Sequence, residues 1–369
     1  MTPNSEAELA EMIASAKAPF EIIGGGTRQI GRVKPPSHPP PASEGRGRLA
    51  EPAVLQTSGL SGIRLYEPEA LTLVAQAGTP LAEIEALLAE NNQRLPFEPY
   101  DLRALQGTTG TPTIGGVVAT NASGPRRIQA GACRDSLIGV RFVDGLGRII
   151  KNGGRVMKNV TGYDLVKLLA GSHGTLGVLT EVSFKLLPAP QATATVLVQE
   201  AEASSAATMA KAMASPYDVS GAAHVGGVTA LRVEGLEGSV AYRGKALAKL
   251  LGGEVGPFDW VAQRDVQAFA DVEGDVWRIS VKPSDGPATA EAVRKLGAQE
   301  VVFDWAGGLL WVLAAKGSPL RQGVTSGHAT LVRGEGPAFP PEPAAIATLS
   351  AALRQKFDPR ALLNPKRMG

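Results

Sequence analysis

The sequence predicts an α+β protein of two domains. Its 369 residues exceed the usual length of a single domain, and hydrophobic residues make up 44% of them, enough for a sizeable core. In the first half, glycine-rich segments separate strand-like runs, and residues 176–187 alternate between apolar and polar side chains. In the second half, strand-like and helical runs take turns, which indicates an antiparallel sheet with helices on one face.

Local signals locate the elements of the first half. Ser5 and Glu8 form a capping box at the start of a helix over 5–16, and Pro80 opens a second helix that reaches residue 90. After Asp164, a short helix is expected to end at Gly171. Strands are expected over residues 20–23, 54–57, 71–77, 140–143, 148–151 and 176–187. The proline-rich stretch 31–48 has no apolar periodicity and predicts an exposed loop.

In the second half, strand-like and helical runs follow one another without long glycine-rich segments. Strands are expected over 195–199, 230–233, 276–281 and 309–313, and helices over 204–214, 239–251 and 288–296. A final helix follows Pro343, with Ile346, Leu349, Leu353 and Phe357 on one side.

Composition excludes several classes of protein. There are 37 basic and 35 acidic residues, so net charge gives no argument for a nucleic-acid or membrane surface. The single cysteine, Cys133, excludes an intrachain disulfide and an iron–sulfur cluster held by this chain alone. The acidic N-terminus does not resemble a secretory signal, and no apolar run approaches membrane-spanning length. We therefore expect a soluble, intracellular protein.

The segment 107–124 reads GTTGTPTIGGVVATNASG and holds no charged residue. Glycine lets a backbone approach a ligand closely, and bare N–H groups with threonine hydroxyls can bind phosphate without a basic side chain. The alternative is a crossing of two closely packed elements. A dinucleotide-binding Rossmann motif is disfavoured, because Gln29 stands where the first loop, 24–26, would need a third glycine. A P-loop is excluded, because no Lys-Ser or Lys-Thr follows the interval from Gly110 to Gly115.

Other polar candidates carry weaker signals. The spacing of the histidines, His38, His173, His224 and His328, does not suit a metal site. Arg126 and Arg127 are either a solvated pair or a charge clamp for an anion. For the cluster of Lys158, Asn159, Tyr163 and Asp164, capping by Thr161 and ordinary hydrogen bonding is favoured over catalysis.

The glycine segments occur in a recognisable order along the chain. GGGTR is followed by TPTIGGVVATNASG, then by GRVMKNVTGYDLVKLLAGSHGTLGVLTEVSFKLLP, and the chain ends in DPRALLNPKR. This order resembles the FAD-binding fold of the vanillyl-alcohol oxidase and para-cresol methylhydroxylase superfamily. GPRR, WRIS and SGHAT further resemble the FAD-binding accessory subunits of bacterial glycolate oxidases, also called glycolate dehydrogenases.

The resemblance implies a domain plan and a set of cofactor contacts. It implies a PCMH-type FAD-binding domain over 1–190, an α+β cap domain over 191–335, and a C-terminal helix and tail over 336–369 that returns to the FAD domain through Asn364-Pro365. The FAD contacts would be Gly24, Gly25, Gly26 and Thr27 at the pyrophosphate, Thr113, Gly115 and Gly116 opposite them, Asn121, Ser123 and Gly124 near the flavin, and Gly177 and Val178 on the dinucleotide. No histidine stands in 24–30, where many relatives attach FAD covalently, so we expect non-covalent FAD.

The resemblance also implies a function shared among subunits. The chain would bind FAD within a complex that oxidises glycolate to glyoxylate, with a catalytic flavoprotein subunit and an iron–sulfur subunit that passes electrons towards quinone. Such a complex is cytoplasmic, and its partners could hold it at the inner membrane. No metal ligand set or catalytic base stands out in this chain. Two alternatives stay open: a self-sufficient FAD oxidoreductase of another hydroxy acid or alcohol, with Arg126, Arg127, Tyr163 or His328 in its site, and a structural subunit with a vestigial flavin site.

Overall fold

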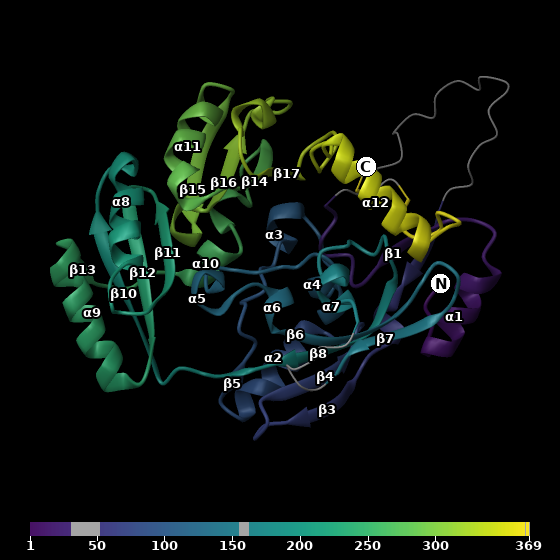
Figure 1. Ribbon diagram of the computed structural model, residues 1–369. Helices are drawn as coiled ribbons and strands as arrows, with labels where there is room; N and C mark the ends of the chain where they lie inside the picture. Colours follow the sequence, from purple (N-terminus) through teal and green to yellow (C-terminus); the bar gives the residue numbers. More distant parts are fainter. Residues whose placement is uncertain (31–51, 155–161, 366, 369) are drawn as a thin grey trace.

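Two antiparallel sheets organise the chain (Figure 1). The computed structural model describes residues 1–30, 52–154, 162–365 and 367–368. The predicted loop 31–48, with His38, and the residues Lys158, Asn159 and Thr161 lie outside this range. We call the part built on the five-stranded sheet the first domain, and the part built on the eight-stranded sheet the second domain.

The N-terminal elements follow the sequence pattern closely. Helix α1 (Glu6–Ser15) begins after Ser5, whose hydroxyl accepts a hydrogen bond of 3.1 Å from the Glu8 backbone N–H. Its apolar side buries Leu9 and Ile13 completely. Strand β1 (Phe20–Ile23) pairs in parallel with β2 (Ala53–Gln56). The predicted helix and both strands are confirmed to within two residues.

The five-stranded sheet has the order β3-β4-β8-β6-β7. Its strands are β3 (Ile63–Glu67), β4 (Thr72–Gln76), β6 (Leu137–Val143), β7 (Ile149–Gly153) and β8 (Val178–Lys185). A small pair adds β5 (Gln93–Arg94) and β9 (Leu187–Pro188). The helices are α2 (Leu81–Glu90), α3 (Arg103–Gln106), α4 (Ile114–Ala119), α5 (Arg127–Ala130), α6 (Cys133–Ser136) and α7 (Leu165–Leu169). Strand β3 and helices α3 to α6 were not predicted, and α4 lies inside the glycine and threonine segment.

The second domain repeats one arrangement along its eight-stranded sheet, which has the order β13-β10-β12-β11-β15-β16-β14-β17. Each half begins with a strand, a helix and two further strands, and pairing of β11 with β15 joins the halves. The first half is β10 (Ala192–Gln199), α8 (Glu202–Met213), β11 (Val219–Val225), β12 (Val228–Gly235), α9 (Glu237–Leu251), β13 (Glu254–Val255) and α10 (Trp260–Arg264). The second half is β14 (Asp275–Ser280), α11 (Gly286–Arg294), β15 (Ala298–Asp304), β16 (Leu309–Ala314) and β17 (His328–Arg333). The predicted α+β architecture is confirmed.

The two faces of the eight-stranded sheet have different partners. Helices α8, α9 and α11 cover one face, and the opposite face is turned towards the first domain (Figure 1). Successive side chains along β14 point to opposite faces of this sheet. Trp277 and Ile279 belong to the core under the helices, whereas Val276 joins a core that also contains Phe97 and Phe184 of the first domain. One apolar core therefore crosses the domain boundary.

The C-terminal segment returns to the first domain. Helix α12 (Ala344–Phe357) confirms the predicted final helix, but Ile346 and Leu349 on its apolar side are exposed. Beyond α12, Leu363 forms a parallel bridge with Phe20 of β1. The chain end thus lies beside the first glycine loop, which follows β1.

Candidate functional site

Three glycine segments that are distant in sequence line one pocket of the first domain. We call it the glycine pocket. It brings together nine of the predicted cofactor contacts, Gly24, Gly25, Gly26, Thr27, Thr113, Gly115, Gly116, Gly177 and Val178. The other described lining residues include Arg28, Gln29, Thr57, Ser172, His173, Asn364 and Arg367. None of the described residues that line the pocket is an aspartate or a glutamate.

The first loop offers backbone donors to the pocket. Gly24, Gly25, Gly26 and Thr27 directly follow β1, and Gly26 adopts a left-handed conformation with φ of 72°. Among the described residues, the backbone N–H groups of these four find no hydrogen-bond acceptor. Consecutive N–H groups without protein partners suit an oxyanion, because phosphate oxygens can satisfy several of them together.

Close packing accounts for several of the glycines. A Cβ on Gly25 would lie 1.6 Å from the Thr111 carbonyl oxygen, and one on Gly110 would lie 1.7 Å from the Gly25 carbonyl oxygen. Similarly, Gly115 packs on Ala77 and donates its N–H to the Ala77 carbonyl at 2.7 Å. Small residues therefore let two loops cross at this wall, so these glycines alone do not demonstrate a ligand.

Thr113 orders the start of α4 at the pocket wall. Its hydroxyl accepts a hydrogen bond of 3.3 Å from the Gly116 N–H, the usual contact of an N-cap residue. The third segment completes the wall where β8 begins. Gly177 packs closely on the Phe142 ring there, since a Cβ on this residue would lie 2.5 Å from the ring. The neighbouring His173 ring packs edge-on against Phe339, and burial lowers the pKa of its imidazole to about 4, so the ring is neutral at physiological pH.

Asn364 ties the C-terminal tail to two walls of the pocket. Its Oδ1 accepts a hydrogen bond of 2.7 Å from the Ile22 N–H, and its Nδ2 donates to the His173 carbonyl at 2.8 Å. The side chain is buried and the backbone φ is 47°, a conformation that asparagine tolerates better than most residues. The tail thereby fixes the strand before the first glycine loop against the segment before β8.

Three predicted contacts, Asn121, Ser123 and Gly124, lie outside the lining of the glycine pocket. The Ser123 hydroxyl accepts from the Cys133 N–H at 2.9 Å, and Asn121 Oδ1 accepts from the Arg134 N–H at 3.0 Å. The Gly124 carbonyl accepts from the indole of Trp305 in the second domain at 3.0 Å. The end of the glycine and threonine segment therefore lies at the domain interface.

Arg28 adds positive charge to the pocket and was not predicted as a contact, although it closes the GGGTR motif. One of its terminal nitrogens donates to the Tyr100 carbonyl at 2.5 Å, while its buried Nε has no hydrogen-bond partner. Burial lowers the pKa of its guanidinium. A pocket with a buried cation, unpaired N–H groups and no lining carboxylate fits the pyrophosphate of a dinucleotide. Thr57 and Arg367 also line the pocket and carried no signal in the sequence.

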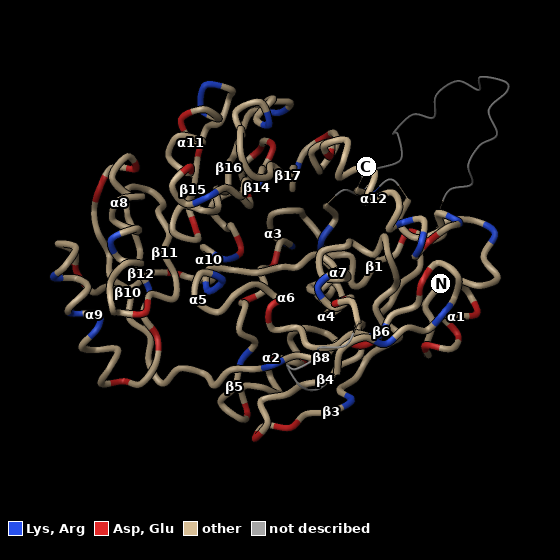
Figure 2. The backbone as a smooth tube through the Cα atoms, in the orientation of Figure 1, with Lys and Arg blue, Asp and Glu red and all other residues tan. Residues whose placement is uncertain are grey.

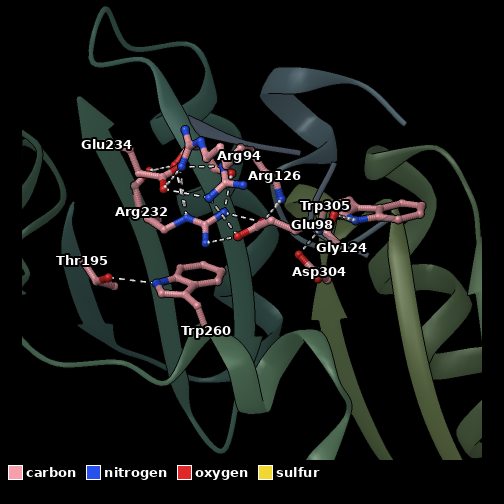
Figure 3. Close-up of polar contacts among 11 residues, drawn as sticks. Arg94, Glu98, Gly124, Arg126, Thr195, Arg232, Glu234, Trp260, Asp304 and Trp305 are labelled. Carbon is pink, nitrogen blue, oxygen red and sulfur yellow. Dashed lines mark hydrogen bonds and ion pairs between the residues drawn. The ribbon is translucent and has the colours of Figure 1, made fainter. Parts of the chain in front are cut away.

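A second polar cluster lies between the domains (Figure 3). It comprises Arg94, Glu98 and Arg126 of the first domain and Arg232 and Glu234 of β12, and we call it the interdomain charge cluster. Two guanidinium nitrogens of Arg232 donate to Glu98 at 2.9 and 2.8 Å. Burial opposes ionisation of Glu234, yet the hydrogen bond from Arg126 and three arginine charges lower its pKa well below the ordinary value.

The remaining candidates from the sequence are dispersed. Arg126 belongs to the interdomain charge cluster, whereas Arg127 contacts the Trp305 ring. Tyr163 and His328 are exposed and line no part of the glycine pocket. Basic and acidic residues are interspersed over both domains (Figure 2). Within the described ranges, no three His, Cys, Asp or Glu side chains are grouped as a metal site would require, and no helix could span a membrane.

Comparisons with known proteins agree with this geometry. The sequence model of the FAD binding domain family matches residues 1–153. Solved structures of alkyldihydroxyacetonephosphate synthase and of p-cresol methylhydroxylase with substrate bound superpose with TM-scores of 0.69 and 0.65, at 14% and 15% identity. They cover 99% and 100% of this chain and 76% and 88% of their own, so the fold is shared.

Two curated relatives are similar in sequence. Glycolate oxidase subunit GlcD of Bacillus subtilis (strain 168) is 34% identical over 144 residues, 39% of this chain and 29% of that protein. Glycolate oxidase subunit GlcE of Escherichia coli (strain K12) is 37% identical over 337 residues, 88% of this chain and 91% of that protein. At that identity and coverage, the chain belongs to the family of glycolate oxidase GlcE subunits.

Proposed function

We propose that this chain is the FAD-binding subunit of a complex that oxidises glycolate to glyoxylate. The observation that carries the proposal is the glycine pocket, in which the N–H groups of Gly24–Thr27 have no acceptor among the described residues and lie beside the buried cation Arg28. The relationship to the GlcE subunit supplies the substrate. FAD, once bound, supplies a centre that accepts a hydride and releases electrons singly.

The chain's own residues would bind and orient the dinucleotide. The N–H groups of Gly24–Thr27 would hold the pyrophosphate, with Thr113, Gly115 and Gly116 opposite and Gly177 and Val178 at the start of β8. Asn121, Ser123 and Gly124 lie towards the domain interface, which is where we place the flavin ring. The face of the eight-stranded sheet that is turned towards the first domain would then exclude water from the ring.

The FAD would be bound without a covalent bond. Residues 24–30 contain no histidine, and the His173 ring on the pocket wall packs edge-on against Phe339. Acid precipitation of the purified protein should therefore release all of the yellow flavin into the supernatant. Flavin that stays with the protein pellet after repeated washing would contradict non-covalent binding.

The complex would divide its chemistry among subunits. A chain with one cysteine cannot supply the thiolates of an iron–sulfur cluster, and the described residues offer no metal cluster to orient a hydroxy acid. We therefore place substrate oxidation on a partner flavoprotein, a GlcD-type subunit, and onward transfer to quinone on an iron–sulfur partner. The similarity over 144 residues to a glycolate oxidase subunit GlcD supports a related flavoprotein as this partner.

One experiment separates the proposal from its alternatives. The chain is purified alone and together with its co-expressed partner subunits, and its visible spectrum and glycolate-dependent dye reduction are measured. We expect flavin in both preparations and rapid glycolate oxidation only in the complex. Rapid turnover by the lone chain would instead support a self-sufficient oxidoreductase. A colourless chain that cannot be reconstituted with FAD would support a structural subunit.

A further inference from the structure

Two guanidinium groups contact one indole at the domain interface. Arg127, the first residue of α5, places its guanidinium carbon 4.3 Å from the centre of a ring of Trp305. Arg278 of β14 places its own guanidinium carbon 4.9 Å from that ring. Trp305 is buried and follows β15 in the turn Trp305–Gly307. The indole therefore attracts two cations that come from different domains.

Neither guanidinium is in direct contact with a carboxylate of the described residues. Arg127 and Arg278 form no hydrogen bond and no ion pair with any described residue, and the Nε of Arg278 is shielded from solvent without a partner. The neighbouring Arg126 differs completely, because its guanidinium is bound by Glu98 and Glu234. A buried guanidinium N–H without a hydrogen-bond acceptor lowers the stability of the folded protein. An acceptor from a bound molecule would remove this cost.

The electrostatics of this place favour an anion. Burial and the nearby charges of Arg278 and Arg134 lower the pKa of the Arg127 guanidinium, and Asp135 opposes this only in part. The acid that acts on Arg278, Asp304, is fully buried, and burial raises its pKa to about 7, so it supplies only part of a negative charge at neutral pH. Two like charges beside one indole, compensated in part by Asp135 and Asp304, would be stabilised by a bound carboxylate.

The location connects this site with the glycine pocket. Gly124, which ends the glycine and threonine segment, accepts the Trp305 indole N–H through its carbonyl, and Arg127 follows three residues later. Arg278 shares its side of β14 with Val276, which is packed in the core common to both domains. The two guanidinium groups therefore lie between the domains, beside the segment that we place near the flavin.

We infer that Arg127 and Arg278 bind the carboxylate of a small organic acid of the 2-hydroxy-acid class at the domain interface, beside Trp305. Two guanidinium groups can each donate two N–H groups to a planar carboxylate, and no other functional group of such an acid needs to be recognised for binding. The choice of a 2-hydroxy acid rests on the proposed function of the whole complex, in which the partner subunit oxidises glycolate; the carboxylate site on this chain rests on the geometry.

Calorimetric titration of the purified FAD-containing chain with glycolate and with oxalate tests the inference directly. The matched variants are R127Q, R278Q and the pair together, with R64Q as a control, because Arg64 is exposed on β3. Each single change should weaken acid binding by about tenfold or more, the pair should abolish it, and R64Q should leave it unchanged. Glycolamide, the neutral analogue of glycolate, should not bind.

A second readout uses the indole. Tryptophan emission should change on titration with acid, and W305F should remove that change although three other tryptophans remain. Flavin content and the urea midpoint of each variant show whether it is folded. Unaltered acid binding by the folded double variant would overturn the inference. A second outcome would also overturn it: no free acid binds, and the double variant fails to assemble with the partner subunits. The two arginines would then bind a carboxylate side chain of a partner subunit and not a small acid.

The two proposals can fail separately. If the chain binds acid through these arginines but holds no FAD, the carboxylate site stands and the proposed function fails. If FAD is bound and the assembled complex oxidises glycolate while the lone chain binds no acid, the proposed function stands and the carboxylate site fails.

Discussion

Arg126 of the first domain binds Glu234 of the second domain through two hydrogen bonds of 2.9 Å each. Only 7% of the arginine side chain and 6% of the carboxylate side chain are exposed, so water cannot replace either partner. Glu98 and Arg232 extend the same contact across the interface. The two sheets are therefore joined by buried charges as well as by a common apolar core.

Removing one charge from this interface should destabilise the protein. E234Q leaves Arg126, Arg94 and Arg232 without their shared carboxylate, and the loss of one partner from a buried ion pair typically costs about 3–5 kcal/mol. We expect a loss of that order in the free energy of unfolding, measured with urea at neutral pH.

E202Q is the matched control. Glu202 of α8 pairs with Arg294 of α11, and both side chains are substantially more exposed than those of Arg126 and Glu234. Exposed pairs contribute at most about 1 kcal/mol. Equal destabilisation by E202Q and E234Q would contradict the importance of burial at the domain interface.

A methyl group at Gly25 should disrupt the crossing of loops at the glycine pocket. In G25A the new Cβ would lie 1.6 Å from the Thr111 carbonyl oxygen, so one of the two backbones must move. Such overpacking typically costs about 1–3 kcal/mol and would displace the N–H groups that we assign to the pyrophosphate. We expect a lower melting temperature and reduced FAD content, measured by thermal unfolding and by absorbance at visible wavelengths.

Gly238 gives the corresponding control. It lies in α9, where a Cβ meets nothing within 4 Å and φ is not left-handed. Because alanine is the better helix former, G238A should be neutral or stabilise the protein by up to about 1 kcal/mol without changing the FAD content. If G25A matched G238A in both measurements, the close crossing of the loops would be refuted.

The fold could be anticipated where local signals were strong. The capping box at Ser5 located α1, and alternation located β4 and β8. Strand β11 escaped notice because it reads VSGAAHV: six of its seven residues are buried, so apolar and polar residues do not alternate, and between the two terminal valines its residues are mostly small. Helix α4 was missed for a related reason, because glycines at Gly115 and Gly116 oppose helix propensity and tertiary packing overrides them.

The candidate site could be anticipated only in part. The order of the glycine segments indicated the residues of the glycine pocket, because each segment carries a local motif. Pairing across the domain boundary has no such signal: nothing near Glu98 in the sequence indicates that Arg232 lies 2.8 Å away. Similarly, Arg126 and Arg127 are adjacent in sequence, yet one is neutralised by carboxylates and the other contacts an indole.

Asn364 should be required for the pocket although it is close to the end of the chain. N364A removes the acceptor of the buried Ile22 N–H and the donor to the His173 carbonyl, and unsatisfied buried groups cost about 1–3 kcal/mol. We expect a lower urea midpoint and weaker FAD retention during gel filtration. N364G separates the causes, because glycine accepts the φ of 47° and lacks only the side-chain hydrogen bonds. Wild-type stability of N364G would exclude a structural role for those bonds.

Asp304 should make stability fall as the pH rises. Burial raises the pKa of its carboxyl from 3.8 to about 7, so between these values the folded protein binds a proton that the unfolded chain has lost. The contribution of this group to stability is complete below pH 4 and is lost as the pH approaches 7, by up to ~1.4 kcal/mol per pH unit. Glu98 adds to the raised pKa, whereas Arg232 and Arg278 oppose it.

D304N tests this dependence, because the amide carries no charge and its oxygen can still accept the Trp305 backbone N–H. The variant should match the wild type near pH 4 and exceed it in unfolding free energy at pH 8, with urea denaturation at several pH values as the measurement. Since the lowered pKa of His173 acts in the opposite direction between pH 4 and 6.5, only the difference between the two proteins isolates Asp304. A difference that stays constant from pH 4 to pH 8 would mean that Asp304 does not titrate in this range.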